Sequence, residues 1–346
     1  MSLDINSFNY DLPPGRIAKY PAEPRDSSRL MYLPRMLDEI SHLHFTDFPD
    51  CLSESDLLVI NDSKVFPARL HGNKKGSGGK VEVFLLQKFE DGAWEALVRP
   101  GRRLPPGTDV EFFEGKLNAT LGERTSSGGR FVNFNADGDV LQIIWENGEV
   151  PLPPYIDRPP EEEDKYRYQT IYAQNIGAVA APTAGFHFTD AILDRLKKQG
   201  VEIARLTLHP GLGTFRPITR TDIDHHQMHE EAFLIPDETA DAIRIAKKTN
   251  RRVIAVGTTT VRALESACDM DGVIIARGWR ETNLFIKPPY PFKVIDGMLT
   301  NFHLPKSTLL LMVCAFAGRE RIMAAYKEAI DNGYRFYSYG DAMLIL

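Results

Sequence analysis

The stretch RRVIAVGTTTVRALES (251–266) places a short apolar run directly before a glycine turn and an amphipathic segment. The run indicates a buried strand, and the segment after Gly257 indicates a helix. Similar strand and helix patterns alternate through the second half of the chain. The predicted helices cover 190–199, 237–249, 261–268, 306–317 and 319–331, and the predicted strands cover 201–208 and 253–256. This alternation predicts an α/β layer.

A different texture fills residues 61–150. Short β-rich runs, such as VEVFLL (81–86) and VEFF (110–113), alternate there with turn dipeptides such as Pro-Gly and Asp-Gly. That spacing predicts a small antiparallel barrel or sandwich. Because residues 1–60 are too few to form a core alone, we expect them to join 151–346 in one discontinuous, mixed α/β main domain. Residues 61–150 are then an inserted antiparallel β-barrel domain.

The composition is that of an ordinary globular protein, with 346 residues, 43% of them hydrophobic and 25% charged. The longest apolar run, 309–317, is shorter than the roughly 20 residues that a membrane-spanning helix needs. No signal or transit peptide pattern opens the chain. We therefore expect a cytoplasmic monomer with no membrane association. Its three cysteines lie far apart without CxxC spacing, which argues against a disulfide framework and a thiolate zinc site.

The net charge is −6, so the chain as a whole does not attract phosphate backbones. A nucleic-acid partner must then meet a local basic patch. Two basic clusters in the β-rich region could form it, although charged hairpin tips also serve solubility alone. The predicted phosphate-binding residues are Lys74, Lys75, Lys80, Arg99, Arg102 and Arg103.

Three loops before predicted helices or after predicted strands could hold a ligand. At 257–259, free N–H groups and the hydroxyls of Thr258 and Thr259 could hold an anion, with Arg262 nearby on the helix. The loop APTAGFHFTDAIL (181–193) could seat an adenine ring, and LTLHPGLGTFRPI (206–218) allows close backbone approach. Ordinary turn geometry and a structural histidine are the competing interpretations. The candidate residues of the last two loops are Thr183, Gly185, His187 and Phe188, and His209, Gly211, Gly213 and Thr214.

Two further clusters carry titratable groups. In HHQMHEE (225–231) a metal site is conceivable, but HExxH spacing and a third ligand are missing. An acid/base role for His229 or Glu230 fits better, against a solvated surface as the alternative. The stretch KVIDGMLTNFHLPKSTLLLMV (293–313) gathers polar residues before an apolar helix, although its serine is alternatively a helix N-cap. The polar residues are Asp296, Asn301, His303, Lys306 and Ser307.

Ten separated blocks, in order, resemble the S-adenosylmethionine:tRNA ribosyltransferase-isomerase family of queuosine biosynthesis. The blocks are YDLPPGRIAKYPAEPRDSSRLM, LLVINDSKVFPARLHG, GGKVEVFLL, YQTIYA, GAVAAPTAGFHFT, LTLHPGLGTFRPI, HQMHEE, VIAVGTTTVRALES, NLFIKPPYPFKVIDGMLTNFHLPKSTLLLMV and YRFYSYGDAMLI. Departures from the family pattern include Ser63-Lys64 in place of Thr-Arg, and Pro210 and Pro289. Lys64 keeps the positive charge but loses the guanidinium fork for a bidentate contact.

The resemblance implies a reaction with S-adenosylmethionine as co-substrate and with no other cofactor and no metal. The sulfonium acidifies the ribose C5′ hydrogens, a protein base removes one, and adenine and methionine depart. The ribosyl group is joined to the aminomethyl-deazaguanine at the wobble position of tRNA, giving epoxyqueuosine.

The resemblance also suggests roles for individual residues. His187, His229 or Glu230 would perform the acid/base work, and Asp296 would face a cation. Two polar groups would flank the place where RNA and donor meet, with a structural salt-bridge network as the alternative. These groups are Arg25, Asp26 and Arg29, and Asn61, Asp62 and Arg69.

Two other functions remain open at this point. The Gly257 turn could hold the donor in an S-adenosylmethionine-dependent RNA methyltransferase, although the glycine-rich first loop of that class is missing. A non-catalytic RNA-binding protein is the second possibility. Titratable groups in four separated blocks argue against it.

Overall fold

The computed structural model describes residues 3–35, 39–89, 91–125, 128–211, 223, 226, 228–275 and 278–346. Within these ranges, nine strands form one mixed sheet drawn from both sides of the β-rich region. In spatial order they are β15 (Gly278–Thr282), β13 (Glu231–Ile235), β12 (Glu202–Leu208), β3 (Leu57–Asn61), β14 (Val253–Val256), β16 (Gly297–Asn301), β17 (Ala342–Ile345), β1 (Arg29–Leu33) and β2 (Ser41–His44). Strands β12, β3, β14 and β16 run parallel, so their carboxyl ends share one edge.

Helices cover both faces of this sheet, because side chains of its central strands alternate between two cores. Val59 and Ala255 belong to a core shared with α4 to α7, whereas Leu58 and Ile254 belong to a core shared with α3. The helices are α3 (Asp190–Lys198), α4 (Asp237–Lys248), α5 (Thr258–Ser266), α6 (Thr308–Ala317) and α7 (Arg319–Asp331). None of the described helices is long and apolar enough to cross a membrane.

Two helix starts differ from the predicted ones for local reasons. Helix α5 begins three residues before the predicted 261, because Gly257 adopts a φ of 89° and turns the chain directly into the helix. Helix α6 begins at Thr308, because Ser307 is its N-cap and its hydroxyl accepts a hydrogen bond from Leu310 N at 3.1 Å. The alternative interpretation of Ser307 as an N-cap is therefore confirmed.

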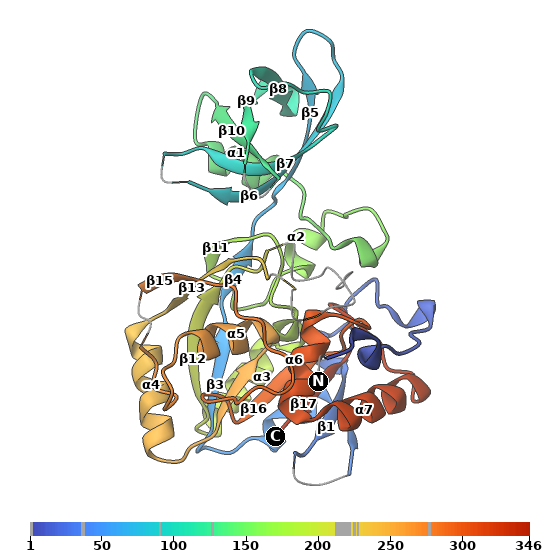
Figure 1. Cartoon of the computed structure of the whole chain (residues 1–346), viewed down its shortest axis with the longest axis vertical. Coiled ribbons are helices and arrows are strands. Elements are labelled where there is room, and N and C mark those ends of the chain that lie inside the picture. Colours follow the sequence, from blue (N-terminus) through green and yellow to red (C-terminus); the bar gives the residue numbers. More distant parts are fainter. Residues whose placement is uncertain are drawn as a thin grey trace.

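The β-rich region is a closed antiparallel barrel with its own core, which confirms the predicted fold class (Figure 1). Closure leaves no unpaired sheet edge. The barrel stands apart from the main sheet, and two chain segments connect them. Its strands, in ring order, are β10 (Arg130–Asn135), β7 (Trp94–Arg99), β6 (Lys80–Lys88), β5 (Arg69–Lys74), β8 (Thr108–Phe112) and β9 (Leu117–Arg124), and α1 (Val140–Asn147) follows them.

The connection between sheet and barrel is held by short-range pairing. Strand β4 (Ser63–Val65) pairs with β11 (Asn175–Ala178) outside the barrel, so residue 61 as the domain boundary stays a prediction. The Gln169 side chain accepts from Val65 N at 3.0 Å and donates to Val65 O at 2.8 Å. The Gln169 amide therefore pairs with the β4 backbone in the way that a neighbouring strand would.

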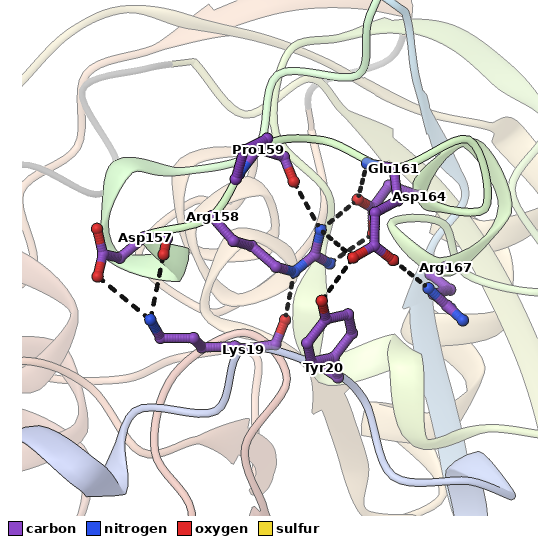
Figure 2. Close-up of polar contacts among 8 residues, drawn as sticks. All are labelled: Lys19, Tyr20, Asp157, Arg158, Pro159, Glu161, Asp164 and Arg167. Carbon is purple, nitrogen blue, oxygen red and sulfur yellow. Dashed lines mark hydrogen bonds and ion pairs between the residues drawn. The ribbon is translucent and has the colours of Figure 1, made fainter.

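An ion-pair network fixes the segment that carries Gln169 (Figure 2). The Arg158 guanidinium donates to both carboxylate oxygens of Asp164, at 2.6 and 2.7 Å, and lies 4.2 Å from the centre of the Tyr20 ring. Burial alone would raise the pKa of the Asp164 carboxyl, but hydrogen bonds from Arg158 and from Glu161 N outweigh it and lower that pKa. The network spans η6 (Pro154–Ile156) and α2 (Asp164–Arg167).

The remaining short 3-10 helices connect these elements. In the described ranges they are η1 (Ile5–Phe8), η2 (Pro14–Arg16), η3 (Arg25–Ser27), η4 (Phe45–Cys51), η5 (Phe113–Gly115) and η7 (Thr183–His187). Helix η4 packs beside α3, and η7 leads from β11 toward α3.

Candidate active site

A cleft lies at the carboxyl edge of the parallel strands, where α/β sheets commonly bind ligands. It brings together the turn after β14, the end of β16, the loop before η7 and the segment before β17. These parts come from separate sequence blocks. The lining residues are Ala181, Pro182, Thr183, Ala184, Pro210, Gly257, Thr258, Thr259, Thr300, Asn301, His303, Leu304, Ser307, Leu309, Tyr337 and Ser338.

One side of the cleft is the amino end of α5. Gly257 is the N-cap residue and provides no side chain, so the first N–H groups of the helix are not capped from within it. Thr258 and Thr259 follow and line the cleft. The helix dipole and free N–H groups favour an anion at such a position. The turn therefore lies at the cleft, and its use as an anion or carboxylate site stays a prediction.

Asn301, at the end of β16, lines the cleft with an unpaired acceptor. Its Nδ2 donates to Tyr337 O at 3.1 Å and to His187 Nε2 at 3.3 Å. Its Oδ1 is buried and has no hydrogen-bond partner. A buried acceptor without a partner costs free energy, so such a group at a cleft is suited to a ligand donor.

His187 stands behind Asn301 instead of lining the cleft. Because Nε2 accepts from Asn301, Nδ1 carries the proton and donates to Ser28 Oγ at 2.7 Å. The ring also stacks on Phe45, with centroids 5.1 Å apart. Burial, together with the positive charges of Arg335 and Arg25, lowers the pKa of His187 to about 3. The imidazole is therefore neutral and has both nitrogens engaged.

His303 is held in a similar neutral state. Its Nε2 is 2.8 Å from Thr300 Oγ1, and burial lowers its pKa to about 3. His303 N donates to the hydroxyl of Tyr326 at 2.9 Å. These contacts fix the imidazole at the cleft wall as a hydrogen-bonding group that is uncharged at neutral pH.

Tyr337, which also lines the cleft, has a strained backbone conformation. Its φ is 74°, which is unusual for a bulky residue, and its hydroxyl is buried without a hydrogen-bond partner. Its carbonyl accepts from Asn301 Nδ2 and from Gly340 N. Strained residues concentrate at functional sites, so this conformation supports the assignment of the cleft as an active site.

The structure gives other predicted residues structural partners near the cleft. Arg262 is buried in an ion pair with Glu231 at 2.6 Å. The Asn61 side chain donates to Leu208 O and accepts from Leu208 N, and it also donates to Thr259 Oγ1 at 3.3 Å. The Asp62 carboxylate accepts from Thr207 Oγ1 at 2.7 Å and from Asn175 Nδ2 at 3.0 Å. These groups shape the sheet edge that carries the cleft.

The predicted residues Arg25, Asp26 and Arg29 also bind partners within the protein. Arg25 donates to the carbonyls of residues 166, 167 and 169, and Asp26 accepts from Thr189 Oγ1 at 2.8 Å. Arg29 donates to Asn332 O and covers the Tyr334 ring at 3.8 Å. These contacts favour the structural alternative for this group, although carbonyls and rings replace the expected salt bridges.

Three further predicted residues lie away from the cleft. Asp296 precedes β16, pairs with Lys247 Nζ at 3.2 Å and accepts from Val253 N at 2.9 Å. A five-residue strand separates it from Asn301, about 16 Å at 3.3 Å per residue. Lys306 donates to Asn6, and Arg69 lies on β5 over the Phe84 ring. The roles proposed for these three residues therefore have no support from position.

The predicted residues around β12 and β13 lie at the same sheet edge as the cleft. His209 Nδ1 is 2.8 Å from Ser63 Oγ, and burial lowers its pKa to about 4. Gly211 N donates to Glu231 at 3.1 Å. His229 and Glu230 are exposed immediately before β13. Gly213 and Thr214 lie outside the described residues.

Gly185 and Phe188 pack inside the loop that precedes α3. A Cβ at Gly185 would lie 2.1 Å from the Tyr172 hydroxyl, so only glycine fits there. The Phe188 ring meets Phe45 and Tyr172 edge-on in the core. Both residues shape the loop that carries Thr183, and within the described residues neither lines the cleft.

The barrel brings its two basic clusters to one end. In the ladder, Asn73 pairs with Lys80 on one side and Glu82 pairs with Arg99 on the other. The loops that follow β5 and β7 are therefore neighbours. Exposed cations of both loops can then act on the same stretch of phosphates. The exposed members are Lys75, Lys80, Arg99, Arg102 and Arg103, and Lys74 is half-buried.

The sequence reasoning missed Ser28, Thr300, Tyr337 and Ser338. All but Thr300 lie in the outermost blocks of the resemblance, EPRDSSRL and YRFYSYGDAMLI. Both blocks match the family although they lie far from the other motifs, and this match could have pointed to a role for their residues in the site. Within the described ranges, no three His, Cys, Asp or Glu side chains gather in the way that a metal site requires.

Comparison with known proteins identifies the family of the chain. The family described as queuosine biosynthesis protein matches residues 5–345. An S-adenosylmethionine:tRNA ribosyltransferase-isomerase of Halothermothrix orenii is 52% identical over 345 residues, covering 99% of this chain and 100% of the relative. Its namesake from Heliobacterium modesticaldum is 51% identical over 344 residues, with the same coverage. The crystal structure of S-adenosylmethionine tRNA ribosyltransferase from Thermotoga maritima has 38% identity and a TM-score of 0.55, covering 98% of this chain and 100% of that chain. The chain belongs to the queuosine biosynthesis protein family.

Proposed function

We propose that this protein is an S-adenosylmethionine:tRNA ribosyltransferase-isomerase. It transfers and isomerises the ribosyl group of S-adenosylmethionine onto the aminomethyl-deazaguanine at the tRNA wobble position. Epoxyqueuosine-tRNA, adenine and methionine are the products. The observation that carries this proposal is the end-to-end likeness to relatives of that name, at 51–52% identity.

The cleft has the parts that the donor requires. The uncapped start of α5, with Thr258 and Thr259, suits the carboxylate of the methionine part. The unpaired Asn301 Oδ1 suits an N–H or O–H donor of the adenine or ribose part. Pro182, Pro210 and other apolar lining groups limit water around the sulfonium.

We assign His187 a positioning role. A neutral imidazole with both nitrogens engaged and a pKa near 3 is a poor proton acceptor at neutral pH. It orients Asn301, which lines the cleft. The exposed His229 and Glu230 remain our proposed acid/base groups for the C5′ proton and the departing adenine.

The same proposal covers partners and location. The basic end of the barrel contacts tRNA phosphates away from the reacting base. S-adenosylmethionine is the co-substrate and no further cofactor takes part. The protein works in the cytoplasm as a monomer.

Product analysis tests the proposal directly. The protein is incubated with S-adenosylmethionine and tRNA that carries the aminomethyl-deazaguanine, and nucleosides are identified by mass spectrometry. The epoxycyclopentene nucleoside, with equal amounts of adenine and methionine, is expected. S-adenosylhomocysteine with a methylated nucleoside would show a methyltransferase instead. Tight tRNA binding without any product would favour the non-catalytic alternative.

A further inference from the structure

An exposed tryptophan lies on the edge strand of the main sheet, close to the cleft. Trp279 in β15 is 55% exposed, although indole rings are usually covered in folded proteins. Its ring stacks on His209, with centroids 5.3 Å apart and planes 26° from parallel. His209 directly precedes Pro210, which lines the cleft. The stacked pair therefore continues the cleft wall outward.

The histidine beneath the tryptophan is a rigid support. Ser63 Oγ holds its Nδ1 at 2.8 Å, and Gly177 packs against the ring. A Cβ at Gly177 would lie 2.6 Å from His209 Nε2, so only glycine permits this approach. The imidazole is neutral at physiological pH because burial lowers its pKa to about 4. Trp279 is thus supported by a fixed, uncharged ring.

Other exposed groups lie beside the connection to the barrel. Ile176, next to Gly177, is 55% exposed and pairs with Lys64 across the β11 and β4 ladder. The Lys64 ammonium lies 4.6 Å from the ring centre of Trp145 on α1. Lys64 follows Ser63 in β4, so its side chain points away from the face on which Ser63 holds His209. We therefore call only the stacked pair of Trp279 and His209 the junction strip.

An exposed ring on a rigid support is typical of surfaces that bind unpaired nucleotides, because every base presents a face for stacking. A continuous aliphatic patch would instead favour a protein partner. Bases next to a nucleotide held in the cleft would reach this strip first.

We propose that the junction strip is a stacking platform for unpaired tRNA bases that flank the reacting base, with Trp279 as its main stacking residue. The proposal rests on the proposed function, since it takes the tRNA and the cleft from it. It adds a recognition site for single-stranded RNA, separate from the basic end of the barrel.

The test compares three variants. Trp279→Ala removes the ring, Trp279→Phe keeps an aromatic face, and Ile245→Ala removes an equally exposed apolar side chain from α4. Binding of an anticodon stem-loop RNA is measured by fluorescence anisotropy, and steady-state kinetics are measured with premodified tRNA. Trp279→Ala should raise the Kd and the KM for tRNA about tenfold, from the usual energy of one base stack. Its kcat, its KM for S-adenosylmethionine and its Tm should stay unchanged, as should all parameters of Ile245→Ala. Trp279→Phe should lie within about threefold of the original protein.

An RNA lacking one base locates the contact. A stem-loop with an abasic site beside the wobble position should bind the original protein about tenfold more weakly, and should bind Trp279→Ala without further loss. A Kd for Trp279→Ala within twofold of the original protein overturns the platform, even if the original protein makes epoxyqueuosine. A change in sedimentation coefficient with unchanged RNA affinity overturns it too, because a second copy of the chain would then cover Trp279. Absence of product from the original protein contradicts the proposed function instead, and the stem-loop measurements still decide on the platform.

Discussion

Polar side chains form different hydrogen bonds at the two ends of the parallel strands, which we call the amino and carboxyl edges of the main sheet. At the amino edge, Asp56 accepts from Arg252 twice, at 2.7 Å each, and from Ser53 N at 2.7 Å, while Asp296 is held by Lys247 and Val253 N. At the carboxyl edge, Asn301 Oδ1 and the Tyr337 hydroxyl are buried without partners. The two acidic side chains at the amino edge are therefore fully paired within the protein, whereas the carboxyl edge keeps two buried polar atoms unpaired. We expect this difference to separate residues that stabilise the fold from residues that bind a ligand.

Low pH should lower the free energy of unfolding through three histidines at the carboxyl edge, and this is the largest effect that we expect. His187, His209 and His303 have pKa values lowered to about 3, 4 and 3, below the ordinary 6.5 of the unfolded chain. Their unfolded forms bind protons first, so stability is intact above pH 6.5 and falls as pH drops toward the folded pKa values. The buried His187 imidazole contributes a slope of about 1.4 kcal/mol per pH unit, and the partly exposed His209 and His303 contribute less.

Urea unfolding at pH 7, 6, 5 and 4.5 measures that slope. His187→Gln should reduce that slope by about one proton. A free energy of unfolding that stays level from pH 6.5 to 5 would contradict the assignment of neutral buried imidazoles to this edge.

Removing a charge from the amino edge should lower the free energy of unfolding and leave the rate of the reaction unchanged. Asp56→Ala loses charge-assisted hydrogen bonds from Arg252 and from Ser53 N, which should lower the free energy of unfolding by about 2–3 kcal/mol. Arg252 is 43% exposed and can turn to solvent, which limits the loss. The kcat of the folded enzyme should not change.

Asp241→Ala is the matched control for that variant. It removes an exposed carboxylate that pairs with Arg244 on α4, worth less than about 0.5 kcal/mol. Chemical denaturation, with activity normalised to folded protein, separates the two effects. A large fall in kcat for Asp56→Ala would mean that the amino edge also supports the reaction.

Asn301 offers the converse test at the carboxyl edge. Asn301→Ala removes the unpaired acceptor, and kcat/KM for S-adenosylmethionine should fall about 30-fold, equivalent to about 2 kcal/mol. Asn118→Ala in the barrel removes another buried amide whose Oδ1 has no partner, and should leave kcat/KM unchanged. Equal effects of the two substitutions would show that Asn301 acts only through folding.

Much of this edge was predictable from sequence. The strand over 253–256 and the helix over 319–331 have the predicted bounds, because apolar runs and glycine turns are local signals. Thr183, Thr258, Asn301 and His303 meet in one cleft, as strand ends followed by polar loops indicate. Asp296 does not, because five strand residues carry the chain from one edge of the sheet to the other.

Other features depend on contacts that no local pattern records. The pairing of His187 with Ser28 joins residues 159 positions apart. The positive φ of Tyr337 is imposed by packing, since Tyr rarely adopts it by preference. The sequence also gives no sign of the buried ion pair between Arg262 and Glu231, so binding of the substrate by Arg262 stays a prediction.

The smallest expected effect comes from Ser28, two contacts away from the cleft. Ser28→Ala removes the acceptor of the His187 Nδ1 proton and leaves a buried N–H unpaired. The imidazole can then rotate and loosen its contact with Asn301, so kcat should fall about fivefold, or about 1 kcal/mol. Ser28→Thr should restore most of the loss, because it returns a hydroxyl at the same place. A positioning role requires that kcat falls while the KM for tRNA stays constant. If Ser28→Ala instead lowers Tm and leaves kcat intact, the chain from Ser28 to Asn301 only supports the fold, and the orientation of the Asn301 oxygen comes from Tyr337 O alone.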